Sequence, residues 1–274
     1  MSLARDIADL ASVTTRLDTV GASSGALSNR NLVITGAMNV AQRGTSSTGI
    51  GASAGYFTCD RWYINSANTA GRLTMSQASD GPSGFANCIK LDCTTADTSI
   101  ASNESLRLIQ RFEGQDLQQF AKGTSAAKEF TVSFYVKANA AFTFGCELFD
   151  NDNSRQISKT FSTTTDWVRH EITFPADTTG AFTDDNALSL QLQFWLHAGS
   201  DFTSGTLNST SWASNTDANR AVGIGSFFSS TSNDFYITGV QLEVGDTATD
   251  FEHRTFGDEL QRCERYYQRI VKHG

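Results

Sequence analysis

Most of this chain alternates apolar and polar residues one by one, which is the pattern of a β-strand with one buried face. The segment 129–138, EFTVSFYVKA, places phenylalanine and valine on one face and polar residues on the other. The segment 187–198, ALSLQLQFWLHA, repeats the pattern over a longer run, with leucine and phenylalanine on one face and Trp195 on the polar face. Such regular alternation is typical of antiparallel sheets that expose one side to water.

Further segments carry the same signal at short intervals along the chain. They read YFTCDRWYI, RLTMSQA, NCIKLDC, SLRLIQRF, FTFGCELF, DWVRHEITF and NDFYITGVQLEV, and turns rich in glycine, serine and asparagine separate them. One segment among them, GQDLQQFAKG at 114–123, has a helical pattern. Many short strands joined in this way predict an all-β fold in which two antiparallel sheets form a sandwich. We assign this sandwich to residues 31–253.

The first twenty residues have a different period. Leu3, Ile7, Leu10, Thr14 and Leu17 fall at alternating steps of four and three, which is the a/d spacing of a coiled coil. We therefore predict an oligomerisation or anchoring helix at 1–20, followed by a flexible linker at 21–30 that contains GASSGALSN. Two heptads also fit a single amphipathic helix packed on its own domain, so both interpretations stay open.

The end of the chain returns to a helical period. Phe256, Leu260, Cys263, Tyr267 and Ile270 are spaced by four and three, with charged residues on the other faces. A threonine at 255 followed by an aspartate three residues later is a reasonable helix start. The pattern predicts a C-terminal amphipathic helix at 254–274. Its apolar side would cover the open end of the sandwich or a neighbouring copy of the chain.

Composition narrows the possible partners. The 274 residues carry a net charge of −8, which argues against nucleic acid as the main ligand. No segment approaches the roughly 20 apolar residues of a membrane span. The opening MSLARDIADL lacks the apolar run of a signal peptide, so we expect a mature chain that begins near Met1 and is made in a cytoplasm. Five cysteines without a CxxC motif favour buried free thiols over zinc or disulfides.

Several segments together resemble a group of bacteriophage tail-fibre and related virion proteins. They are NLVITGAMNVAQRG, CDRWYI, LIQRFEGQDLQQFAKGTSAAKEFTVSFYVKA and ITGVQLEVGDTATDFEHRTFGDELQRCERYYQRI, of which the last is the most specific. The resemblance covers about 31–270. It implies a jelly roll like that of a carbohydrate-binding module, a homotrimer, and a structural or receptor-binding role in the virion. The implied partners are other tail or capsid proteins and a host-surface receptor, including a glycan.

The search for catalytic or cofactor chemistry finds no motif. GIGASAG, 49–55, has one residue too many for a dinucleotide loop, and P-loop, HExxH and GxSxG sequences are missing. Carboxylates cluster at Glu147, Asp150 and Asp152, where turn formation is the simplest interpretation. A calcium site and a carboxylate pair for glycoside hydrolysis are the alternatives. We expect no cofactor and no enzymatic activity, and we keep a glycan-degrading enzyme as the competing hypothesis.

Aromatic residues are the remaining candidates for receptor or glycan binding. The polar segment 198–223 is long for a loop in a compact domain and contains Phe202 and Trp212. Trp195 precedes it on the polar face of its strand. We predict that Trp212 marks an exposed recognition surface, with Trp195 and Phe202 as further candidates. The alternative is that Phe202 and Trp212 fold back and cap the end of the sandwich.

The heptad leads to a prediction about assembly. We expect the full chain to be a homotrimer joined through Leu3, Ile7, Leu10 and Leu17, and sedimentation of the full chain against a chain that begins at Asn29 measures this. A full chain that is monomeric at micromolar concentration contradicts the prediction. If both chains are trimers, the assembly is real but the helix is not its cause.

Overall fold

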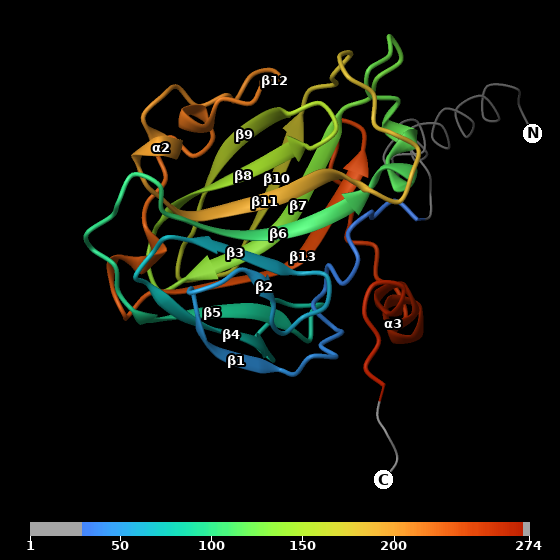
Figure 1. Ribbon diagram of the computed structural model, residues 1–274. Helices are drawn as coiled ribbons and strands as arrows, with labels where there is room; N and C mark the ends of the chain where they lie inside the picture. The colour runs from blue at the N-terminus through green and yellow to red at the C-terminus, as the bar shows by residue number, and fades with distance from the viewer. Residues whose placement is uncertain (1–28, 271–274) are drawn as a thin grey trace, which may run out of the picture.

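The computed structural model describes residues 29–270, which form a sandwich of two antiparallel sheets (Figure 1). The predicted helix at 1–20 and most of the predicted linker lie outside the described residues. The six-stranded sheet has the order β1 (Ser46–Ile50), β4 (Arg72–Ala78), β5 (Cys88–Thr95), β13 (Asp234–Val244), β7 (Phe130–Ala138), β10 (Val168–Phe174). The seven-stranded sheet has the order β12 (Ala213–Ser214), β9 (Arg155–Ser162), β8 (Thr143–Asp150), β11 (Leu188–Ala198), β6 (Ser105–Glu113), β3 (Tyr63–Ala67), β2 (Gly55–Tyr56).

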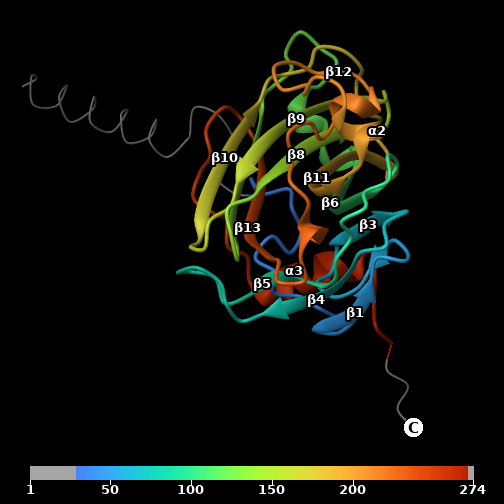
Figure 2. The ribbon, with the colours of Figure 1, turned by 90° about the vertical axis from the view of Figure 1, so that its left-hand side faces the viewer.

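The predicted all-β sandwich is confirmed. The apolar residues of the alternating segments are buried between the two sheets. Figure 2 shows the sheets as two layers, with β10 and β13 in one layer and β8, β9 and β11 in the other. Phe134 of β7 and Phe194 of β11 are fully buried and meet across the layers with ring centroids 5.0 Å apart. Burial of such rings and of the surrounding aliphatic side chains is the main favourable term for the fold. The five cysteines are buried and free, as predicted.

The strand prediction differs from the structure at four places, since β1, β9 and β12 were not predicted and one predicted strand is divided. YFTCDRWYI forms two strands instead of one, because β2 ends at Tyr56 and the chain turns before β3 begins at Tyr63. Arg61 in that turn has a φ of 70°, which a strand does not tolerate. Strand β9 was missed because Lys159 interrupts its buried positions, and in the fold Lys159 Nζ donates to the Thr173 carbonyl at 2.7 Å.

The segment after Asn29 pairs with the part of β13 that β5 leaves open. β5 pairs with β13 only from Asp234 to Ile237, so the following backbone of β13 needs other partners. The Asn31 side chain supplies them, because its Nδ2 donates to the Val240 carbonyl at 3.2 Å and its Oδ1 accepts from Leu242 N at 3.2 Å. Gly36 lies so close that an added Cβ would be 2.1 Å from the Val240 carbonyl oxygen.

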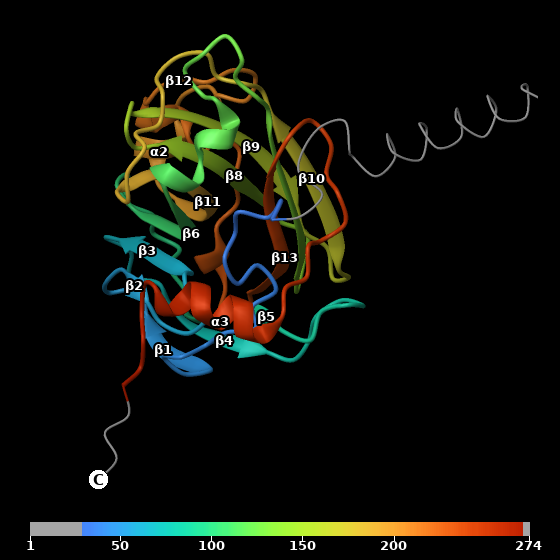
Figure 3. The ribbon, with the colours of Figure 1, turned by 90° about the vertical axis from the view of Figure 1, so that its right-hand side faces the viewer.

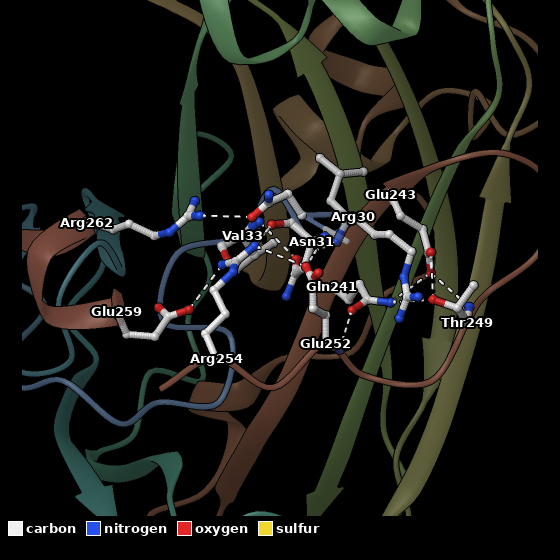
Figure 4. A network of polar contacts seen from close by, with 12 residues as sticks. Arg30, Asn31, Val33, Gln241, Glu243, Thr249, Glu252, Arg254, Glu259 and Arg262 are labelled. Carbon is white, nitrogen blue, oxygen red and sulfur yellow. Dashed lines mark hydrogen bonds and ion pairs between the residues drawn. The ribbon is translucent and has the colours of Figure 1, made fainter. Parts of the chain in front are cut away.

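The same segment is held by the helix α3 (Phe256–Glu264), which lies across one end of the sandwich (Figure 3). Glu259 is only 7% exposed, and its Oε2 accepts from Thr35 N at 2.5 Å while its Oε1 pairs with Arg254 at 3.0 Å. Arg254 also donates to the Val33 carbonyl at 3.1 Å. We call this set of residues the terminal clasp, and all of them except Thr35 are labelled in Figure 4: Asn31, Val33, Thr35, Gln241, Glu252, Arg254, Glu259.

The helix begins as predicted but ends earlier. The Thr255 side chain accepts from Asp258 N at 3.2 Å, which caps the first turn. The helix stops at Glu264, so the predicted extent of 254–274 is too long. Tyr266 and Tyr267 lie beyond its end, where both backbone N–H groups donate to the Cys263 carbonyl. Their rings stack on arginines instead of continuing the apolar stripe of the helix.

Glu259→Ala tests the clasp. We expect the free energy of unfolding to fall by about 3 kcal/mol, because the change leaves Arg254 and the Thr35 N–H buried without their partner. Denaturant unfolding of the wild type and the variant measures this. Asp258→Ala is the matched control on an exposed position of the same helix. Equal losses in the two variants would contradict a special role for Glu259.

Candidate functional site

The outer face of the seven-stranded sheet carries aromatic, guanidinium and amide groups side by side. Strand alternation directs Arg107 of β6 outward, and its backbone partners are Asn65 of β3 and Trp195 of β11. The next row holds Tyr63 of β3 and Gln193 of β11, and Arg111 follows on β6. We call this surface the arginine face: Tyr63, Asn65, Arg107, Arg111, Gln191, Gln193, Trp195.

Arg107 is fixed at the centre of the arginine face. Its Nη1 donates to Gln193 Oε1 at 3.1 Å and its Nη2 donates to Asn65 Oδ1 at 3.0 Å. Its Cζ lies 4.7 Å from the ring centroid of Trp195, within the range of a cation–π contact. Burial lowers the pKa of Arg107 to about 10. Among the described residues it has hydrogen bonds but no ion pair.

A second arginine stands on the same strand. The Cζ of Arg111 lies 3.9 Å from the ring centroid of Tyr63, and the Tyr63 ring meets the Tyr56 ring edge-on at 5.0 Å. Arg61 Nη2 donates to the Arg111 carbonyl. The side chains of Tyr63 and Arg111 are half-buried, so part of each is open to a ligand. The segment of β6 was predicted as a strand, but the outward arginines in SLRLIQRF were not recognised as site candidates.

Trp195 lies on the outer face of β11, as the alternation predicted, but it is not exposed. Its exposed fraction is 0%, because the segment 199–223, seen in orange along the edge of the sheet in Figure 1, covers it. Phe202 lies half-buried with its ring 5.2 Å from Trp195, and Arg220 Cζ lies 5.0 Å from the same ring. The indole Nε1 donates to Glu147 Oε2 at 2.8 Å. Trp195 therefore packs against the Arg107 guanidinium group and does not contact solvent.

Trp212 is also buried, so the prediction of an exposed ring is wrong. Its exposed fraction is 7%, and its Nε1 donates to the Pro175 carbonyl at 2.8 Å. Its ring packs 5.5 Å from Phe130 and 5.4 Å from the ammonium of Lys122. The alternative, in which Trp212 folds back and caps the sandwich, describes its position. The proposed roles of Trp212, Trp195 and Phe202 in receptor binding stay predictions.

Two of the three carboxylates considered for catalysis are engaged in ion pairs, and the third, Asp152, accepts hydrogen bonds from Thr183. Glu147 is fully buried and accepts two hydrogen bonds from Arg220, at 2.8 Å to Oε1 and 3.0 Å to Oε2. Asp150 is fully buried and pairs with Lys122 at 2.6 Å. Within residues 29–270, no group of three or more His, Cys, Asp or Glu side chains is placed to hold a metal ion. No helix in that range is long and apolar enough to cross a bilayer.

Comparison with known proteins gives structural neighbours only. No family model matches the sequence, and no curated protein matches it. A family 4 carbohydrate-binding module is 13% identical, with a TM-score of 0.37 and coverage of 68% of this chain and 87% of that chain. The family 11 module of cellulase Lic26A-Cel5E from Clostridium thermocellum is 10% identical, with a TM-score of 0.36 and coverage of 74% and 97%.

A tailspike protein is among the neighbours as well. The enzymatically active domain of tailspike protein 4 from bacteriophage CBA120 is 10% identical, with a TM-score of 0.36. The match covers 67% of this chain but 19% of that chain.

Trp212→Ala tests the burial of this side chain. We expect the free energy of unfolding to fall by about 3–5 kcal/mol, because the change leaves a cavity beside Phe130 and frees the Pro175 carbonyl. Thermal unfolding of the variant measures the loss. A melting temperature equal to that of the wild type would show that the ring contributes no core packing.

Proposed function

We propose that this protein binds glycans on the arginine face and serves as a receptor-binding component of a bacteriophage virion. The observation that carries the glycan proposal is the placement of Tyr63, Arg111 and Arg107 on one face of neighbouring strands. Sugar rings present C–H surfaces that pack on aromatic rings, while their hydroxyl groups accept and donate hydrogen bonds. This face offers a half-buried ring, two guanidinium groups and the side-chain amide of Asn65, while the Gln193 amide is buried and orients Arg107.

The arginine face is organised before any ligand arrives. Arg107 is already held by Gln193 and Asn65 and is supported by the Trp195 ring. A side chain held in this way loses little rotamer freedom when it binds, which favours affinity. Its remaining N–H groups are the ones that a sugar hydroxyl would use. Rigid strands, rather than loops, also keep the spacing between Tyr63 and Arg107 constant.

The same contacts favour binding over hydrolysis. Glycoside hydrolysis needs one carboxylic acid and one carboxylate on either side of the sugar bond. Glu147 of β8 lies opposite Gln193 in the sheet, and its two oxygens already accept hydrogen bonds from Arg220 and Trp195. A reducing-end assay on bacterial polysaccharide tests the competing hypothesis of a glycan-degrading enzyme.

The virion role rests on the resemblance of the sequence to tail-fibre and related virion proteins. It includes a homotrimer, attachment to other tail or capsid proteins, and contact with a host-surface receptor. A single shallow glycan site typically binds near the millimolar range, about −4 kcal/mol, so three linked copies would add useful avidity. Immuno-electron microscopy of purified phage particles tests the location.

Tyr63→Ala tests the glycan face. We expect it to weaken binding to an array of bacterial cell-surface polysaccharides by about tenfold, since the change removes the half-buried ring and the support of Arg111. Tyr236→Ala is the matched control. Tyr236 is also a half-buried tyrosine on a strand, with a lysine 4.7 Å from its ring, but it lies on the six-stranded sheet.

The control and the wild type decide the outcome. Tyr236→Ala should bind as the wild type does, and both variants should keep melting temperatures near that of the wild type. An equal loss of binding in the two variants, or a wild type that binds no polysaccharide on the array, would overturn the proposal.

A further inference from the structure

A cavity of about 150 Å³ opens where the end of α3 meets the N-terminal part of the fold. Figure 3 shows the red segment after α3 passing beside β2 at this place. We call it the tyrosine pocket, and its lining residues are Arg43, Tyr56, Asp60, Arg61, Tyr266, Tyr267. The buried thiol of Cys263 forms part of its wall.

Two arginines in the tyrosine pocket are stacked on the two tyrosines that follow α3. Arg61 Cζ lies 3.5 Å from the ring centroid of Tyr266, and Arg43 Cζ lies 3.5 Å from that of Tyr267. Stacking covers the face of a guanidinium group and leaves its N–H edge free to donate. The tyrosine pair thus orients two cationic edges toward one small cavity.

Arg61 has an unusual position for a charged side chain. It is 8% exposed, and among residues 29–270 it takes part in no ion pair, unlike the buried Arg220 and Arg254. Its Nη2 donates to the Arg111 carbonyl, and its Nε has no hydrogen-bond partner. Burial lowers the pKa of Arg61, which shows that its charge is poorly solvated. A buried cation of this kind is stabilised by an anion that enters its pocket.

The backbone at Arg61 supports the same conclusion. Its φ of 70° lies in the left-handed region, where glycine or asparagine would fit with less strain. Non-glycine residues in this region cluster at functional sites because the side chain is needed there. Arg61 is one of seven non-glycine residues with a positive φ among the described residues, and its guanidinium reaches the pocket.

Asp60 does not neutralise both arginines. Its Oδ2 accepts from Gln42 Nε2 at 2.5 Å and its Oδ1 accepts from Gln42 N at 3.1 Å. Arg43 approaches it at 3.4 Å, while Arg61 makes no ion pair with it. Two guanidinium groups therefore face one carboxylate that is already engaged, so the charged side chains that line the cavity leave it net positive.

We propose that the tyrosine pocket binds the carboxylate of an acidic sugar in a glycan that lies on the arginine face. The planar guanidinium edge matches two carboxylate oxygens, which is the geometry of a bidentate pair. The two sites are continuous, because Tyr56 lines the pocket and its ring also meets Tyr63. This inference rests on the proposed function, and it assigns the ligand to the class of acidic polysaccharides.

Ligand-observed NMR on the full chain tests the pocket by itself. The probes are sodium glucuronate, glucose as its neutral counterpart, and inorganic phosphate. We expect saturation transfer to glucuronate and none to glucose, and we expect Arg43→Gln and Arg61→Gln each to weaken glucuronate binding at least about tenfold. Arg169→Gln is the matched control, since Arg169 is a half-buried arginine paired with Glu171 on the other sheet.

The outcomes separate this inference from the proposed function. Asn65→Ala should weaken polysaccharide binding, because Asn65 holds Arg107, but it should leave glucuronate binding unchanged, because Asn65 does not line the pocket. Glucuronate binding without polysaccharide binding supports the pocket and overturns the glycan face. Polysaccharide binding with no glucuronate signal, or glucuronate binding that survives both arginine changes, overturns the pocket. Phosphate that binds as strongly as glucuronate overturns the assignment to a carboxylate. If Arg61→Gln does not fold, Arg43→Gln decides.

Discussion

Glu259 and Asn31 join two segments that lie at opposite ends of the described chain, and much of the fold depends on that junction. The Glu259 carboxylate accepts a hydrogen bond from the backbone of Thr35, 224 residues away in sequence. The Asn31 amide completes the edge of β13 where β5 no longer pairs with it. Buried backbone groups need such partners, because leaving one unsatisfied costs about 1–3 kcal/mol. The terminal clasp therefore satisfies the open backbone groups of β13 and holds α3 against the end of the sandwich.

The terminal clasp also determines where the tyrosine pocket forms. Because Glu259 fixes α3 against Thr35, the residues after the helix reach the turn that contains Arg61. Tyr266 then stacks on Arg61 and Tyr267 stacks on Arg43. The rings of the two tyrosines after α3 thus contact charged guanidinium groups instead of the apolar core. A structural contact and a candidate binding site share one short segment of the protein.

The distribution of charge on this acidic protein follows from the same arrangement. Although the net charge is −8, Arg61, Arg107 and Arg111 lie on or beside one surface without ion pairs among the described residues. In contrast, arginines that hold the long segment 199–223 and its surroundings are paired, as Arg220 is with Glu147 and Arg155 is with Asp177. The paired cations hold the framework together, while Arg61, Arg107 and Arg111 are held by hydrogen bonds and by stacking on aromatic rings.

The sequence by itself determined the fold class, most of the strands and the start of the last helix. Each of these depends on local periodicity or on a cap such as Thr255, which neighbouring residues specify. Alternation also placed Trp195 on the outer face of β11. It did not show whether that face was open, because exposure depends on what packs against it. The pattern also extended the last helix past Glu264, where the structure instead stacks Tyr266 and Tyr267 on two distant arginines.

Only the tertiary structure decided which side chains meet at the site. The segment 199–223 returns over β11 and buries Trp195, while Trp212 enters the core beside Phe130. The arginine face joins β3, β6 and β11, whose residues are separated by up to about half of the chain. The sequence does not show which aromatic ring an arginine will stack on, or whether a carboxylate will pair with it. Those are properties of long-range packing, which sequence periodicity does not encode.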